Sequence, residues 1–170
     1  MYNGSPHNIR LISVLRGRPQ AAAEIAGSAS YPAVSGIVQF YHTNAGVIVY
    51  AEIDGLPKPT STECGGKVFG FHIHEGNMCG GDMNDPFAGA MSHYDPHGCA
   101  HPYHAGDMPP LFGNNGFALS LFLTDRFSIP EIIGRTVIIH DSSDDFTTQP
   151  SGASGTKIAC GHIRQVTGRR

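Results

Sequence analysis

Alternation of apolar and polar side chains dominates the first third of the chain. Every second residue from Val47 to Ile53 is apolar, and the residues between them include Tyr50 and Glu52. A period of two places these apolar side chains on one face of a β-strand. Comparable segments at residues 20–25 and 34–42 are separated by turn-forming residues. The pattern therefore predicts three strands, at residues 20–25, 34–42 and 46–53.

Strand-like segments return after a break, and no helical pattern longer than a turn or two is present. Further strands are predicted at residues 67–75, 117–124, 136–141 and 157–166. Residues 76–115, rich in Gly, Pro, Asp and His, and the polar residues 142–155 are predicted as loops. The pattern favours an all-β sandwich or flattened barrel. A loop of about forty residues within one domain is usually functional or held by something other than a core.

The composition fits one turn-rich domain of 170 residues. Charged residues make up 15% of the chain, below the roughly 25% of an average domain, and 22 residues are glycine. The net charge of -3 and the absence of a long basic run exclude nucleic acid as an expected partner. We expect a single domain at residues 20–166, a mobile N-terminal extension at residues 1–19 and a C-terminal tail at residues 167–170.

The sequence predicts no membrane span, because no apolar stretch approaches roughly 18 residues. The opening MYNGSPHNIR lacks the pattern of a secretory signal, so the compartment is open: cytoplasmic as the sequence stands, or extracytoplasmic if a leader has been removed. The cysteines form no CxxC pair, which disfavours a zinc knuckle and leaves one or two disulfides as alternatives. They are Cys64, Cys79, Cys99 and Cys160.

Two histidines in the predicted strand 67–75 are the first candidate metal ligands. His72 and His74 are two residues apart, so both imidazoles project from one face of the strand. Phe71 and Ile73 point to the opposite face, where they can pack in a core. Two nitrogen ligands on a rigid strand suit a metal site; a pair of exposed strand histidines is the alternative.

A second cluster lies in the long loop, within SHYDPHGCAHPYHAGDMP. It contains His93, His97, His101, His104 and Asp107. Three histidines and one aspartate would make a closed four-coordinate zinc site, whereas a nitrogen-rich set suits copper. Together with His140, at the end of the predicted strand 136–141, the two clusters could supply one zinc site and one copper site. A solvated loop that happens to be rich in histidine is the alternative.

Four motifs together resemble the copper/zinc superoxide dismutase family, and its bacterial-type members in particular. They are GFHIHE at residues 70–75, the segment from SHYDP to HAGDMPPL at 92–111, GRTVIIHD at 134–141 and SGTKIACGHI at 154–163. The resemblance extends from about residue 20 to residue 163. It implies a Greek-key β-sandwich or flattened barrel of about eight antiparallel strands, with long metal-binding and electrostatic loops.

The resemblance assigns a role to each candidate ligand. It implies that copper is bound by His72, His74, His93 and His140, and zinc by His93, His101, His104 and Asp107, with His93 bridging the two metals. It also implies that Asp144 links His72 to His101 and fixes both rings. Only two residues separate His101 from His104, and His97 is a competing candidate. His7, His42 and His162 are read as non-ligands.

Three further residues or pairs follow from the same resemblance. Cys79 and Cys160 correspond to the family's disulfide, which closes a segment of about eighty residues. Cys64 and Cys99 are additional, and either form a second disulfide or are free thiols. Lys157 occupies the position of the family's active-site arginine; it keeps the positive charge but lacks the planar guanidinium.

The implied activity is that of an antioxidant oxidoreductase, with superoxide as substrate and copper and zinc ions as cofactors. Two superoxide ions would be converted to dioxygen and hydrogen peroxide, with His93 and Lys157 as catalytic residues. A metal-binding or structural β-domain of the same fold with little turnover is the alternative function. The oligomeric state, monomer or homodimer, is left open by the sequence.

Overall fold

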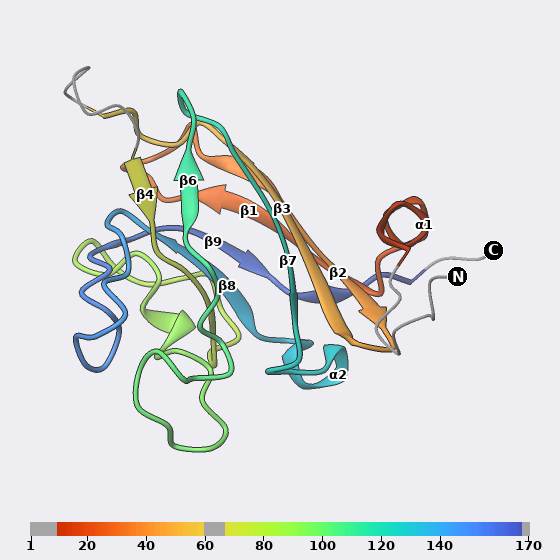
Figure 1. Ribbon diagram of the computed structural model, residues 1–170. Coiled ribbons are helices and arrows are strands. Elements are labelled where there is room, and N and C mark those ends of the chain that lie inside the picture. Colours follow the sequence, from red (N-terminus) through yellow and green to blue (C-terminus); the bar gives the residue numbers. More distant parts are fainter. Residues whose placement is uncertain (1–9, 60–66, 168–170) are drawn as a thin grey trace.

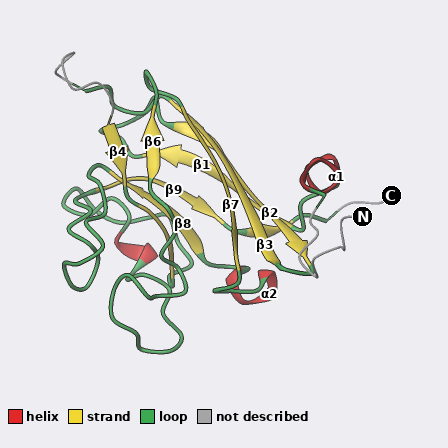
Figure 2. Ribbon diagram, viewed as in Figure 1, coloured by secondary structure: helices red, strands yellow, loops and turns green. Residues whose placement is uncertain are grey.

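The computed structural model describes residues 10–59 and 67–167, and most of their regular structure is β-strand (Figures 1 and 2). Eight strands form one curled antiparallel sheet in the order β5-β8-β9-β1-β2-β3-β7, with β10 paired to β1. These strands are β1 (Ala21–Gly27), β2 (Ser35–Thr43), β3 (Gly46–Asp54), β5 (Phe71–His74), β7 (Ala118–Thr124), β8 (Thr136–His140), β9 (Lys157–His162) and β10 (Arg164–Gln165). The predicted all-β class is confirmed.

Smaller elements complete the described residues. A second sheet pairs β4 (Lys67–Phe69) with β6 (Leu111–Gly113). The helical elements are α1 (Leu11–Arg16), the 3-10 turn η1 (Ala88–Ala90) and α2 (Ile129–Ile132). Helix α1 lies within the expected N-terminal extension and contacts β2. Residues 1–9 and 168–170 lie outside the described residues, and the domain limits stay a prediction.

The structure divides two strands that the alternation predicted as continuous. The segment 67–75 is interrupted at Gly70, whose N–H donates to the Ser142 carbonyl (2.7 Å) and whose carbonyl accepts from the His140 N–H (2.9 Å). A Cβ at Gly70 would lie 2.9 Å from the Ser154 side chain. The chain thus passes from the small sheet to the large one at a point where only glycine fits. The segment 157–166 is interrupted at Ile163, and β6 lies within the predicted loop 76–115.

One face of β5 belongs to the core and the other faces two long loops. Phe71 and Ile73 are fully buried in the main apolar cluster, among side chains from β1, β2, β3 and β8. His72 and His74 point the opposite way, as the strand period predicts. The loops at residues 75–110 and 141–156 lie together on that side of the sheet (Figure 1). Strand β5 is therefore anchored in the core by one face and presents two imidazoles to the loops from the other.

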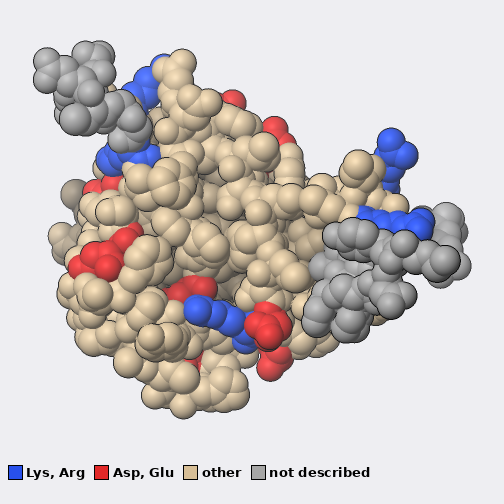
Figure 3. Space-filling view, viewed as in Figure 1, with Lys and Arg blue, Asp and Glu red and all other residues tan. Residues whose placement is uncertain are grey.

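A disulfide joins Cys79, in the first loop, to Cys160 in β9, the pair implied by the family resemblance. Cys99 is free and exposed, and Cys64, its partner in the possible second disulfide, lies outside the described residues. Disulfides are typical of proteins from oxidising compartments. Among the described residues, no helix has the length and apolarity to span a bilayer. Charged side chains form small separated groups on the face shown in Figure 3.

Candidate metal centre

The candidate ligands meet in two groups that share His93. In each group the ligand atoms lie within 4.8 Å of one another, and all seven side chains are buried. The first group draws on β5, β8 and the long loop, and the second lies entirely in that loop. The groups are His72, His74, His93 and His140, and His93, His101, His104 and Asp107. His97 belongs to neither group and is exposed.

Backbone carbonyls orient two rings of the all-histidine group. His74 donates from Nδ1 to the Met91 carbonyl (2.8 Å), and His140 donates from Nδ1 to the Gly155 carbonyl (3.3 Å). A carbonyl only accepts, so each Nδ1 carries the proton and each neutral ring has its lone pair at Nε2. These two Nε2 atoms lie 3.3 Å apart. Two lone pairs at this distance are satisfied by a cation between them.

Asp144 orients one ring in each group. Its carboxylate accepts from Nε2 of His72 and from Nε2 of His101, both at 2.8 Å. Nδ1 of each ring therefore holds the lone pair, and both atoms are buried without a hydrogen-bond partner. Burial raises the pKa of Asp144, but hydrogen bonds from His72, the Phe146 N–H and His101 outweigh it and lower the pKa to about 2. A single carboxylate thus fixes the tautomer of two rings, and so leaves one Nδ1 lone pair free in each group.

His93 presents its two nitrogens to different groups. Nδ1 lies 2.7 Å from Oδ1 of Asp107, whose other oxygen lies 3.0 Å from Nδ1 of His101 and 3.3 Å from Nδ1 of His104. Nε2 of His93 is buried without a hydrogen-bond partner and is the atom left for the all-histidine group. One imidazole can therefore bind two ions. Three nitrogens and a carboxylate fit zinc, and four nitrogens fit copper.

Burial keeps three imidazoles of the all-histidine group neutral. Loss of hydration lowers the pKa of His72 to about 4 and that of His140 to about 3, and it lowers the pKa of His74 well below its usual value. Burial raises the pKa of Asp107, but the hydrogen bond with His93 helps to bring it below its ordinary value. At neutral pH these three imidazoles hold free lone pairs and Asp107 is ionised, as binding to a metal ion requires.

A cavity of about 550 Å³ opens onto the all-histidine group, and His74, His93, His140 and Lys157 line it. Lys157 on β9 is the backbone partner of His140 on β8, and the strand register shifts between Ile139 and His140. The ammonium of Lys157 donates to Oδ2 of Asp85 (2.8 Å) and to the Phe87 carbonyl (3.2 Å). Sequence reasoning missed Asp85, since nothing in its surroundings distinguishes it from other loop aspartates.

Gly152 is a second residue that sequence reasoning missed. Its φ is +68°, and a Cβ there would collide with the Asp144 carboxylate and lie 2.7 Å from Nε2 of His101. Glycine is therefore needed to let the backbone approach the hydrogen bond between Asp144 and His101. Its SerGly context indicates a turn in the sequence, but the contact joins segments about fifty residues apart.

A comparison with protein-family models shows which family this chain belongs to. The family model described as "Copper/zinc superoxide dismutase (SODC)" matches residues 34–163, more than half of the chain. The chain belongs to the copper/zinc superoxide dismutase family. As a member of this oxidoreductase family it is expected to use copper and zinc, and the two ligand groups fit these ions.

Relatives of this dismutase cover most of its length. Superoxide dismutase [Cu-Zn] 2 of Aquifex aeolicus is 32% identical over 146 residues, which are 77% of this chain and 80% of the relative. Superoxide dismutase [Cu-Zn] of Deinococcus radiodurans is 30% identical over 169 residues, covering 88% and 87%. The Cu/Zn superoxide dismutase structure from Brucella abortus has a TM-score of 0.67 at 21% identity, covering 84% of this chain and 98% of that chain, and shows the shared fold.

Proposed function

We propose that this dismutase converts two superoxide ions and two protons to dioxygen and hydrogen peroxide at a copper site joined to zinc through His93. The observation that carries the proposal is the single imidazole of His93, whose Nδ1 serves one ligand group and whose Nε2 serves the other. The proposed copper ligands are His72, His74, His93 and His140, and the proposed zinc ligands are His93, His101, His104 and Asp107.

Each residue near the cavity has a defined task in the proposed reaction. Copper held by these ligands would supply the one-electron redox chemistry that oxidises one superoxide and reduces the other. His93 takes up a proton at Nε2 in the first half-reaction and donates it to the forming peroxide in the second; solvent supplies the other proton. Asp144 and the carbonyls of Met91 and Gly155 hold the surrounding rings in the tautomers that face the metals.

Lys157 is proposed to attract the anion, with Asp85 opposing it. The lysine lines the same cavity as the proposed copper ligands, where its positive charge raises the local concentration of an anionic substrate. The ion pair with Asp85, at 2.8 Å, compensates part of that charge. We therefore expect the steering field to be weaker than that of an unpaired lysine at this position.

Two substitutions test this balance. Lys157→Ala should lower kcat/KM by about tenfold and weaken its dependence on ionic strength, with copper and zinc still bound. Asp85→Asn removes the opposing charge but keeps an oxygen that accepts from Lys157, so it should raise kcat/KM at low salt. Pulse radiolysis at several salt concentrations measures both effects. An unchanged rate and salt slope in Lys157→Ala would mean that another residue guides the anion.

Metal content measured beside activity tests the function itself. Protein loaded with copper and zinc should disproportionate superoxide, and protein loaded with zinc alone should not. The rival function is a metal-binding or structural β-domain with little turnover. A protein that binds both metals and gains stability from them, yet shows no dismutase activity, would favour that rival.

A further inference from the structure

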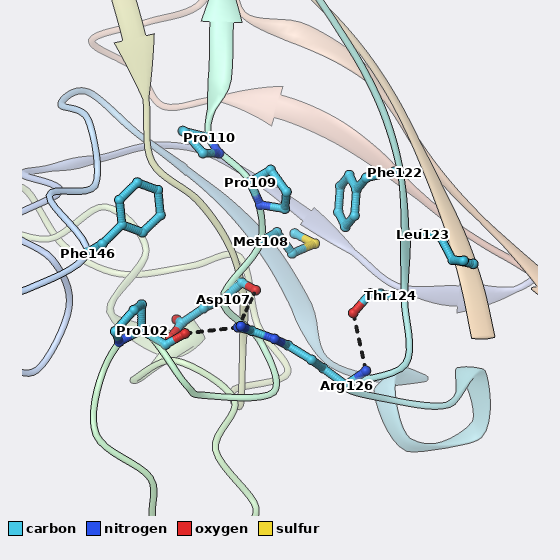
Figure 4. Close-up of a pocket in the computed structure, with 10 residues that line it drawn as sticks. All are labelled: Pro102, Asp107, Met108, Pro109, Pro110, Phe122, Leu123, Thr124, Arg126 and Phe146. Carbon is cyan, nitrogen blue, oxygen red and sulfur yellow. Dashed lines mark hydrogen bonds between the residues drawn. The ribbon is translucent and has the colours of Figure 1, made fainter. Parts of the chain in front are cut away.

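Arg126 reaches from the sheet into the loop that carries the proposed zinc ligands. It follows β7, and its Nη1 lies 2.9 Å from the Pro102 carbonyl, 3.3 Å from the Asp107 carbonyl and 3.4 Å from the His104 carbonyl. Figure 4 shows the side chain extending from the end of β7 toward Pro102 and Asp107. One guanidinium nitrogen thus meets the backbone of two proposed zinc ligands and of a residue between His101 and His104.

The backbone of Arg126 is well anchored. Its N–H donates to Oγ1 of Thr124 at the end of β7 (3.2 Å), and the next residue, Phe127, is buried in the main core. The ring of Phe127 meets that of Phe40 on β2 edge to face, with centroids 6.3 Å apart. The Arg126 side chain therefore extends from a rigid part of the backbone, and its hydrogen bonds can fix the loop relative to the sheet.

The loop segment that Arg126 contacts leaves the sheet and returns to the same place. The backbone N–H of Tyr94 donates to the Ile73 carbonyl (2.8 Å), and the backbone N–H of Ile73 donates to the Gly106 carbonyl (2.9 Å). Residues 95–105 form the excursion between these two bonds, and residues 96–100 are exposed. His101 and His104 are on this excursion, so its position sets where their Nδ1 atoms lie.

The excursion is held from two sides. On one side, the Gln149 side chain accepts from the His101 N–H (2.9 Å) and donates to the His101 carbonyl (2.7 Å). On the other side, Arg126 meets the carbonyls of Pro102, His104 and Asp107. A cation beside zinc also repels it, so the hydrogen bonds must outweigh this repulsion if Arg126 favours zinc.

We propose that Arg126 is a positioning residue for zinc: its hydrogen bonds to the loop carbonyls hold His104 and Asp107 in the geometry that binds the ion. The inference rests on the zinc ligand set proposed above. Arg126 touches the backbone of the ligands and neither the metal nor the substrate. Its effect should therefore appear in zinc affinity and in the arrangement of the zinc ligands, which Co²⁺ bound in the same site reports.

Zinc affinity of four proteins tests the proposal: wild type, Arg126→Ala, Arg126→Lys and Arg164→Ala. The control, Arg164 on β10, is an exposed arginine whose loss changes the net charge equally. Competition with a chromogenic chelator should show zinc binding about tenfold to a hundredfold weaker in Arg126→Ala, the range typical of lost outer-shell contacts. Arg126→Lys, which keeps a charged donor, should recover part of the loss, and Arg164→Ala should match wild type.

The Co²⁺-substituted proteins provide a second readout. Visible absorption of Co²⁺ in the zinc site should change in Arg126→Ala, because displaced ligands alter the ligand field. Zinc binding within twofold of wild type, or tighter, with an unchanged cobalt spectrum would overturn the role of Arg126. A wild-type protein that binds no zinc would instead overturn the proposed zinc ligand set, so the two failures are distinguishable.

Discussion

His93→Ala is expected to disturb both metals and to lower the dismutase rate by at least about a hundredfold. The alanine removes Nδ1 from the group around Asp107 and Nε2 from the group around His140, so each ion loses one ligand. It also removes the proposed proton donor to peroxide, and loss of a general acid alone commonly costs at least a hundredfold. Metal analysis of the purified variant, with pulse radiolysis for the rate, measures both effects.

Two other histidine variants make the His93 experiment specific. His140→Ala removes a ligand from the all-histidine group alone, so it should mainly reduce copper binding and leave zinc in place. His97→Ala replaces an exposed histidine that belongs to neither group, so metal content and rate should match wild type. Normal copper and zinc content in His93→Ala would contradict the bridging assignment.

Removal of the disulfide is expected to cost the fold about 4 to 5 kcal/mol of unfolding free energy. The bond joins residues 81 positions apart. In the chain-entropy model, closing a loop of that length lowers the conformational entropy of the unfolded chain and so stabilises the folded state by about 4 to 5 kcal/mol. We expect this loss in the double variant Cys79→Ala with Cys160→Ala. Alanine is preferred to serine because Cys160 is buried with Phe87 and Ile138. Denaturant unfolding of the metal-free proteins measures the difference.

The free cysteine supplies a matched control for the disulfide. Cys99 is exposed and unbonded, so Cys99→Ala should leave the unfolding free energy within about 0.5 kcal/mol of wild type. Unfolding free energies that match between the double variant and wild type would contradict the stabilising role of the bond.

Local patterns predicted most of the sheet, because strand periodicity is a property of neighbouring residues. The alternation from Val47 to Ile53 corresponds to β3, whose Val47, Val49, Ala51 and Ile53 are buried. Helix α2 was missed although Ser128 and Glu131 form its capping box, because a helix of four residues is too short to display a helical period. Strand β6 was missed because its three residues pair with β4, which lies about forty residues earlier in the chain.

The sequence by itself predicted the all-β class, because alternation is a property of neighbouring residues, and its resemblance to the family supplied the seven candidate ligands. Only the tertiary structure decided how these ligands are held. Asp85 beside Lys157, Gly152 beside His101 and Arg126 beside the loop carbonyls each join segments far apart in the chain. Such contacts depend on how the loops pack over β5 and β8, and each partner is an ordinary residue in its own local sequence.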